Sequence, residues 1–335
     1  MQKPTIIIAE IGVNHDGSYE KAVEMIRKAA EAGADYVKFQ TFRADRLVCA
    51  EAERAEYQKE NCGGDESQLD MLRRYELTES QFRSLAEECR RAGVGFLSSA
   101  FDRESIDILD SIGMDFWKIP SGEITNLPYL RKIAKPGRKV ILSTGMSETE
   151  EISRAVGVLT EGGVMAQDIT ILQCNTQYPT APADVNLRAM QTLAALDCGS
   201  VGYSDHTVGI AVAVAAVALG ASVIEKHFTL DRAQAGPDHR ASADPDELRR
   251  MVAAIREVEH ALGSPEKRPT ASELPNRAVA RKSIVASREI KRGELLTEEN
   301  LTVKRPGTGL SPMLWDEVCG THAKRGFAAD EQIEI

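Results

Sequence analysis

Short apolar runs rich in β-branched residues alternate along the chain with longer segments whose apolar residues recur at helical spacing. The short runs predict eight strands, at residues 5–11, 36–41, 95–99, 116–120, 139–144, 169–174, 200–204 and 222–228. The longer segments predict eight helices, near residues 19–32, 79–92, 103–111, 126–134, 149–162, 186–195, 209–219 and 244–262. This alternation favours an α/β fold of the (β/α)8 TIM-barrel type over an open doubly wound sheet. The chain also lacks the glycine-rich motifs of Rossmann and P-loop folds.

Three stretches depart from this alternation. Residues 43–77 form a long, charged connection between the second strand and its helix, which predicts a lid or a partner contact on the catalytic face of the barrel. Residues 263–280 contain three prolines and no strong periodicity, so they are interpreted as a linker. Residues 281–335 show short alternating strands. We therefore expect a barrel domain at 1–262, a linker at 263–280 and a small, mainly β domain at 281–335.

Composition and charge exclude several classes of protein. The 335 residues include 51 acidic and 41 basic side chains, a formal net charge of −10, which disfavours nucleic acid as the main partner. Six cysteines without a C-x-x-C pair indicate scattered thiols rather than a disulfide framework. The chain runs from Pro4 directly into a strand-like segment without signal-peptide features, and its most apolar stretch, 210–224, is too short to span a bilayer. We expect a cytoplasmic protein without a membrane partner.

Two lysines lie inside predicted strands, where a buried ammonium group needs an anionic partner. Lys38 and Lys118 could each pair with Glu10 or Glu123 and simply fill the barrel, or they could hold a bound anion or form a Schiff base. Four serines near strand ends favour a pocket for phosphate or carboxylate groups: Ser99, Ser121, Ser143 and Ser204.

Two histidines, His206 and His227, end consecutive strands, which are neighbours in a barrel. Imidazole suits a divalent transition metal, so we predict a metal site that water and substrate oxygens complete. The alternative is a pair of hydrogen-bonded histidines near the rim. His15 has a weaker claim, because N-H-D-G can form a turn. The remaining histidines are predicted to lie on the surface: His239, His260 and His322.

Motifs at the strand ends carry a resemblance to a known family. They include A-E-I-G-V-N-H-D-G (9–17), V-K-F-Q-T (37–41), K-I-P-S-G-E-I-T-N-L-P (118–128), G-Y-S-D-H-T (202–207), E-K-H-F-T (225–229) and V-K-R-P-G (303–307). Through them the whole chain closely resembles the phosphoenolpyruvate-dependent sialic acid synthases, which end in a SAF (antifreeze-like) domain. That family condenses phosphoenolpyruvate with an open-chain N-acetylmannosamine-type sugar, giving a nine-carbon 2-keto acid and phosphate.

The resemblance implies a role for each matching residue. The implied catalytic residues are Glu10, Lys38, Lys118 and Glu123. The implied substrate-binding residues are Gln40, Ser99, Phe101, Ser121, Ser143, Thr176, Tyr178, Ser204, Asp238 and Arg305. His206 and His227 would hold Mn²⁺, Mg²⁺ or another divalent ion. Arg305 would reach the site of a second subunit, which implies a domain-swapped homodimer.

Several details favour one branch of the family. N-L-P-Y-L (126–130), D-E-S-Q-L (65–69) and Arg281-Lys282-Ser283 look more like the N,N′-diacetyllegionaminate branch, whose sugar is 2,4-diacetamido-2,4,6-trideoxymannose. N-acetylneuraminate synthesis from N-acetylmannosamine stays open. Two further alternatives are a related phosphoenolpyruvate aldolase that makes a 3-deoxy-2-keto sugar phosphate, and a non-catalytic carbohydrate-binding protein. A SAF-like tail argues against the first, and the intact set of charged residues argues against the second.

Overall fold

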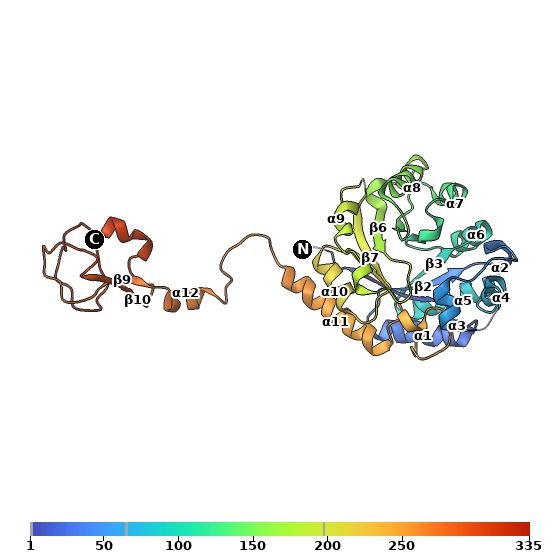
Figure 1. Cartoon of the computed structure of the whole chain (residues 1–335), viewed down its shortest axis with the longest axis horizontal. Helices are drawn as coiled ribbons and strands as arrows, with labels where there is room; N and C mark the ends of the chain where they lie inside the picture. The colour runs from blue at the N-terminus through green and yellow to red at the C-terminus, as the bar shows by residue number, and fades with distance from the viewer. Residues whose placement is uncertain (1–2, 64–65, 197) are drawn as a thin grey trace. The chain divides into compact units, whose positions relative to one another are not determined.

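The computed structural model describes residues 3–63, 66–196 and 198–335. The chain divides into two compact units, Met1–Gly263 and Ser264–Ile335 (Figure 1). Asp65, the first residue of the D-E-S-Q-L motif, lies outside the described residues. Among the described residues, no helix combines the length and the apolar character that crossing a bilayer requires.

Eight parallel strands form the centre of the first unit. They are β1 (Ile6–Gly12), β2 (Tyr36–Thr41), β3 (Gly95–Ala100), β4 (Trp117–Ile119), β5 (Val140–Ser143), β6 (Ile169–Cys174), β7 (Ser200–Asp205) and β8 (Val223–His227). Hydrogen-bonded ladders join them in the order β3-β2-β1-β8-β7-β6-β5-β4, and the two end strands, β3 and β4, pack against each other. The predicted (β/α)8 barrel is confirmed.

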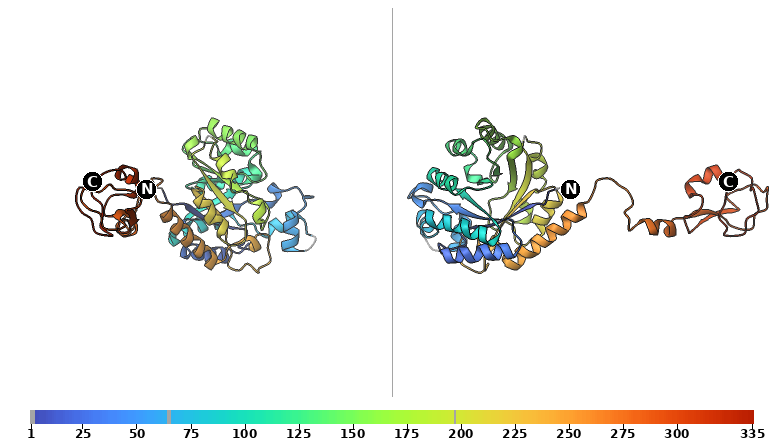
Figure 2. Two further views of the ribbon diagram at one scale, coloured as in Figure 1. Left: turned by 60° about the vertical axis from the view of Figure 1, so that its left-hand side comes forward. Right: turned by 180° about the vertical axis from the view of Figure 1, so that it is seen from behind.

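Among the described residues, eight helices follow the strands. They surround the barrel, as Figures 1 and 2 show. They are α1 (Tyr19–Glu31), α5 (Glu79–Ala92), α6 (Arg103–Ile112), α7 (Leu127–Ile133), α8 (Thr149–Glu161), α9 (Ala189–Leu193), α10 (Ala211–Ala218) and α11 (Pro245–Leu262). Short 3-10 turns lie between them: η1 (Ser121–Glu123), η2 (Ala166–Asp168), η3 (Pro182–Asp184) and η4 (His239–Ala241). Local signals set the ends: Thr78 and Gln81 form a capping box at the start of α5, and Gly93 ends it with a φ of 78°.

The charged connection at 43–77 folds into three short helices, α2 (Ala44–Leu47), α3 (Glu56–Cys62) and α4 (Gln68–Arg73). Its two ends are tied together, because the Glu76 carboxylate accepts a hydrogen bond from Ala44 N at 2.6 Å. In the left view of Figure 2 this blue segment stands out at one side of the barrel.

The second unit is small and has its own core. It contains α12 (Leu274–Ala280), β9 (Ser283–Ala286), β10 (Leu301–Lys304), η5 (Pro312–Leu314) and α13 (Trp315–Val318). β9 and β10 pair antiparallel, and their inward residues pack with Ile290, Val318 and Phe327. Helix α12 lies within the stretch that was interpreted as a linker. All of its residues are exposed, so no apolar periodicity in the sequence indicated it.

Candidate active site

Side chains inside the barrel alternate in two layers, which follow from the two-residue period of a strand. An apolar layer closes the bottom: Ile8, Leu97, Ile141, Leu172 and Val223. Two residues further along the same strands, polar groups replace the apolar ones, for example Glu10 above Ile8 and Glu225 above Val223. These polar groups form the floor of a cavity of about 640 Å³ at the carboxyl ends of the strands.

Two buried lysines and two buried glutamates form one network on this floor. Lys38 Nζ lies 2.9 Å from Glu10 Oε2 and 3.7 Å from Glu225 Oε2, and Lys118 Nζ lies 3.3 Å from Glu225 Oε1. Burial opposes charge on Glu225, but the ammonium groups of Lys118 and Lys38 outweigh it and hold the pKa of this carboxyl below its ordinary value. Burial also raises the pKa of Glu10 and lowers that of Lys118. Glu225 is therefore a shared counter-ion for both lysines.

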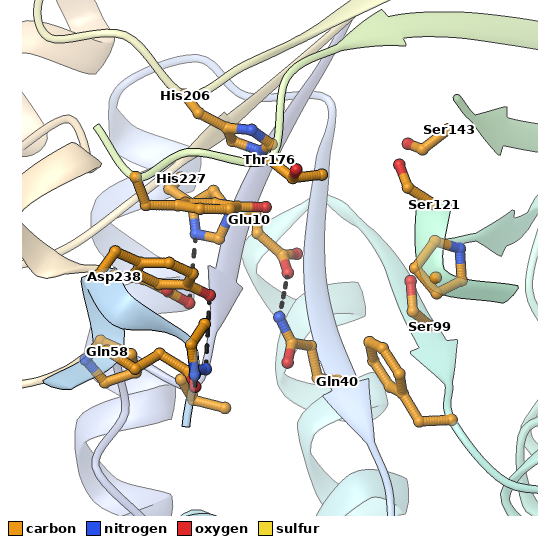
Figure 3. Close-up of a pocket in the computed structure, with 18 of the residues that line it drawn as sticks. Glu10, Gln40, Gln58, Ser99, Ser121, Ser143, Thr176, His206, His227 and Asp238 are labelled. Atoms are coloured by element: carbon orange, nitrogen blue, oxygen red, sulfur yellow. Dashed lines mark hydrogen bonds and ion pairs between the residues drawn. The ribbon is translucent and has the colours of Figure 1, made fainter. Parts of the chain in front are cut away.

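Hydroxyl groups line one side of the cavity. Lys118 Nζ donates to Ser143 Oγ at 2.8 Å, and Lys38 Nζ to Ser99 Oγ at 3.4 Å. Ser121 Oγ accepts from Gly145 N at 2.8 Å. Figure 3 shows Ser99, Ser121 and Ser143 on one side of the cavity, facing Glu10 and Gln40. Cationic nitrogens and hydroxyls in this arrangement provide hydrogen-bond donors for an anion.

Two imidazoles lie on the other side, with Asp238 beside them (Figure 3). The ring centroids of His206 and His227 are 5.3 Å apart, and the Tyr178 ring lies 4.1 Å from that of His206. Burial lowers the pKa of His206 to about 4 and that of His227 well below its ordinary value, so both rings are neutral at pH 7. His227 Nδ1 lies 3.8 Å from Asp238 Oδ2 and has no hydrogen-bond partner among the described residues.

The donor set is compatible with a metal that the protein holds by two ligands. His206 Nδ1–H donates to the carbonyl of Asn175, so the lone pair that a ligand needs is on Nε2, with Ser204 Oγ 3.4 Å away. Neutral imidazole is the form that binds metals. In the part of the chain that the structure describes, no three His, Cys, Asp or Glu residues converge as a metal site. A bound ion would therefore need water or substrate oxygens as well.

The predicted sugar-binding residues line the same cavity. Gln40 Nε2 donates to Glu10 Oε1 at 3.1 Å. Burial raises the pKa of Asp238 to about 7 and that of half-buried Glu123 above its ordinary value. The structure brings together every predicted site residue except Arg305: Glu10, Lys38, Gln40, Ser99, Phe101, Lys118, Ser121, Glu123, Ser143, Thr176, Tyr178, Ser204, His206, His227 and Asp238. Arg305 belongs to the second unit, where its exposed side chain donates to Ala280 O.

Comparison with known proteins agrees with this geometry. A sequence model of the NeuB family matches residues 25–267, and one of the SAF domain matches residues 281–334. The chain belongs to the NeuB family. The predicted resemblance to sialic acid synthases with a SAF domain is thus confirmed, and the mainly β character of the second unit fits the SAF match.

Three relatives show how close the match is. The N,N′-diacetyllegionaminic acid synthase of Campylobacter jejuni is 48% identical over 331 residues, which is 99% of each chain. The N,N′-diacetyllegionaminic acid synthase of Legionella pneumophila is 46% identical over 325 residues, 96% of this chain and 91% of that one. The crystal structure of an N-acetylneuraminic acid synthetase from Leptospira borgpetersenii, in complex with citrate, has a TM-score of 0.71 and 33% identity. The match covers 82% of this chain and 90% of the Leptospira chain.

Sequence reasoning missed some residues of this NeuB-family site. Glu225 lies in the E-K-H-F-T motif but is absent from the predicted site residues, although it shares the inward face with Val223 and His227 and so had a signal in the two-residue period. Side chains from 43–77 also line the cavity, among them Tyr57, whose ring stacks on Tyr178 with centroids 5.0 Å apart. That segment has no strand pattern, so only its place in the chain suggested a lid.

One histidine was predicted wrongly. His239 is fully buried, not on the surface. Its Nδ1 lies 2.7 Å from Thr229 Oγ1 and its Nε2 lies 3.3 Å from Asp16 Oδ1. The loop that carries His239 folds back onto the turn after β1, a contact distant in sequence that no local pattern indicates. His260 and His322 are exposed, as predicted, and His15 is buried within a turn.

Proposed function

We propose that this chain condenses phosphoenolpyruvate with open-chain 2,4-diacetamido-2,4,6-trideoxymannose to give N,N′-diacetyllegionaminate and phosphate. The observation that carries the reaction class is the pair of buried lysines that share Glu225 on the floor of a cavity that two neutral imidazoles also line. The choice of sugar is supported by the match to the Campylobacter enzyme over the full length of both chains. The high identity makes a shared reaction the simplest interpretation.

Phosphoenolpyruvate would occupy the lysine and serine side of the cavity. Its phosphate and carboxylate carry about three negative charges near neutral pH, and a buried anion needs cationic or hydrogen-bonding partners. Lys38 and Lys118 supply the charge, and Ser99, Ser121 and Ser143 supply hydroxyl groups around it. Ser204, whose hydroxyl donates to Glu225 Oε1 at 3.1 Å, completes the floor.

The bond changes balance with one water. Carbon 3 of phosphoenolpyruvate attacks the aldehyde carbon of the sugar, a C–C bond forms and the aldehyde oxygen takes up a proton. Water adds to carbon 2, the bond between carbon 2 and the phosphate oxygen breaks, and a ketone and inorganic phosphate result. Glu10, Gln40, Glu123, Thr176, Tyr178, Phe101 and Asp238 would bind the sugar. Among them, the carboxyl groups of Glu10, Glu123 and Asp238 have raised pKa values that suit proton donation.

A divalent ion, Mn²⁺ or Mg²⁺, would be held by His206 and His227. Once bound, such an ion polarises a carbonyl oxygen as a Lewis acid. The chain's own contribution is to keep both imidazoles neutral by burial and to fix the His206 ring through its hydrogen bond to Asn175 O.

We also propose a domain-swapped homodimer in which Arg305 of one subunit contacts the sugar's N-acetyl group in the other. The V-K-R-P-G motif supports this, because Arg305 is exposed and directly follows β10 in the SAF domain. A guanidinium donates readily to an amide carbonyl.

The experiment is phosphate release from phosphoenolpyruvate with each of two sugars. We expect turnover with 2,4-diacetamido-2,4,6-trideoxymannose, and a nine-carbon 2-keto acid as product. Turnover only with N-acetylmannosamine would favour the second candidate, N-acetylneuraminate synthesis, which the Leptospira structure supports at 33% identity. Phosphate release with neither sugar would contradict the proposal and favour a carbohydrate-binding protein.

A further inference from the structure

A small apolar cluster lies apart from the main core of the barrel and borders the cavity. Its buried members are Val13, Phe42, Met71 and Tyr75, with Leu47, Cys62, Leu72 and Phe101 packed against them. Six of these side chains also line the cavity, and we call them the apolar wall: Val13, Leu47, Met71, Leu72, Tyr75 and Phe101. Apolar groups that face a cavity are stabilised when a ligand covers them with apolar surface.

The wall contrasts with the floor of the same cavity. The floor consists of charged and hydroxyl groups at the strand ends. Most of the wall comes instead from the charged connection at 43–77: Leu47 from α2, Met71 and Leu72 from α4, and Tyr75 just after α4. A ligand that fills the cavity must therefore be ionic at one end and carry apolar groups at the other.

The connection at 43–77, which carries most of the wall, is held in place by hydrogen bonds to the rest of the barrel. Asn61 Nδ2, from α3, donates to Pro237 O at 2.8 Å, next to Asp238 of the site. Arg43 N, before α2, donates to the Asp102 carboxylate at 3.0 Å. A surface that is already ordered loses little conformational entropy when a ligand binds, so its contacts contribute to selectivity.

We propose that the apolar wall determines which sugar is accepted by contacting the distal end of the sugar chain, carbons 4 to 6. This inference rests on the proposed condensation. The aldehyde carbon must lie near the floor, beside carbon 3 of phosphoenolpyruvate, so the distal end points away from the floor. In the favoured sugar carbon 4 carries an acetamido group and carbon 6 is a methyl group, whereas in N-acetylmannosamine each of these carbons carries a hydroxyl. Both exchanges place a methyl group against the wall.

The expected selectivity follows from that chemistry. A methyl group that covers leucine and methionine side chains removes apolar surface from water, whereas a hydroxyl there loses hydrogen bonds to water. Discrimination by an apolar pocket against an added hydroxyl is limited to about 100-fold. The wall therefore produces a preference for the deoxygenated sugar without excluding the hydroxylated one.

The test replaces one wall residue and a matched control on the same helix. Leu72 and Leu69 both lie on α4 and both are half-buried, but only Leu72 lines the cavity. We expect Leu72→Asn to lower kcat/KM for the diacetamido sugar by about tenfold, a typical effect of one lost apolar contact. The KM for phosphoenolpyruvate and kcat/KM for N-acetylmannosamine should change less than about threefold. Leu69→Asn should leave the ratio of the two sugars' kcat/KM values unchanged.

A second variant comes from another element, so that the result does not depend on one helix. Leu47→Asn, on α2, is half-buried as well and should shift the same ratio in the same direction. An unchanged ratio in both Leu72→Asn and Leu47→Asn, with the wild-type enzyme active, would overturn the role of the wall and leave the proposed function standing. A wild-type enzyme that releases phosphate with neither sugar would overturn both.

Discussion

Two buried networks of lysine and carboxylate groups lie on opposite faces of strand β8, and they differ in how completely their polar atoms are paired. On the outward face, Lys226 Nζ donates to Asp205 Oδ2 at 2.8 Å and to Thr207 O, and Asp205 Oδ1 accepts from Thr207 N at 2.9 Å. We call this the closed network. On the inward face, Glu225 is shared by Lys38 and Lys118. We call this, together with Glu10, the open network.

The open network has unused hydrogen-bonding capacity. Glu225 Oε2 has no hydrogen-bond partner among the described residues, and the network forms the floor of a cavity. Asp205 and Lys226 do not line that cavity. A buried charged group therefore does not by itself indicate a binding site, because a fully paired network can stabilise the fold without any ligand. A partly paired network that faces a cavity indicates a ligand.

The largest effect is expected at His227, the proposed metal ligand on the inward face of β8. His227→Ala should reduce turnover by at least about 1000-fold, because a Lewis acid contributes several kcal/mol to the reaction. The fold should remain, because His227 Nδ1 has no hydrogen-bond partner among the described residues to lose. Turnover and metal content after dialysis against Mn²⁺ are measured for the wild type and the variant. Unchanged metal content and activity would contradict the assignment of His227 as a ligand.

A matched pair of substitutions tests the comparison directly. Lys226→Met, in the closed network, leaves Asp205 buried without its cation and should lower the free energy of unfolding by about 3–5 kcal/mol. Lys118→Met, in the open network, leaves Glu225 paired with Lys38 and should affect folding less. Instead it should weaken phosphoenolpyruvate binding by about 2–5 kcal/mol.

The measurements for this pair are urea unfolding and the KM values of both substrates. The sugar KM should change little in Lys118→Met. If Lys118→Met destabilises the fold as much as Lys226→Met and leaves the KM and kcat for phosphoenolpyruvate unchanged, the two networks do not differ in function.

Sequence patterns predicted the fold because strands and helices are signalled locally. The largest difference in bounds, three residues, is at the start of α9, which was predicted at 186 and begins at Ala189. The inward face of each strand was also predictable from the two-residue period, so Lys38 and Lys118 were found. The pairing of these lysines with one shared glutamate depends on how strands β2, β4 and β8 meet in space, which no single strand encodes.

The rest of the site depends on contacts between distant segments. Tyr57 and Leu72 reach the cavity because the connection after β2 folds over the strand ends, and nothing in their local pattern indicates this. His239 is buried by the turn that holds Asp16. Residues of this kind follow from tertiary packing, which overrides local polarity.

A smaller effect is expected for the pH dependence of the unfolding free energy. It comes from His15, which belongs to neither network. Burial lowers the pKa of His15 from 6.5 to about 4, so between these values the unfolded chain binds a proton that the folded chain does not. Stability from this group is fully present above pH 6.5 and falls by about 3 kcal/mol as the pH drops to 4. In His15→Asn, an amide oxygen can replace Nδ1 as acceptor from Gly17 N. The variant's unfolding free energy should therefore fall less between pH 7 and 4.

The control for this measurement is an exposed histidine. His260→Asn should keep the wild-type pH dependence, because His260 is exposed at the end of α11. Parallel pH profiles for the wild type and His15→Asn would show that His15 is not held neutral by burial.

The smallest expected effect tests whether a second subunit completes the sugar-binding part of the cavity above the open network. Arg305→Ala should raise the sugar KM by about fivefold, since one hydrogen bond to a neutral amide contributes about 1 kcal/mol. The phosphoenolpyruvate KM should not change, because Lys38 and Lys118 remain in place. Lys304→Ala, at the neighbouring exposed residue, should leave both KM values unchanged.

Mixing subunits then separates action within one chain from action between chains. Arg305→Ala subunits keep His227, and His227→Ala subunits keep Arg305, so one of the two sites in a mixed dimer has both residues. Random exchange makes half of the dimers mixed, and with half of their sites intact, activity at low sugar concentration should reach roughly a quarter of the wild-type value. Exchange itself is confirmed by mixing subunits of different mass. If mixed dimers form and activity does not rise above that of the separate variants, Arg305 does not act across subunits and the swapped dimer is wrong.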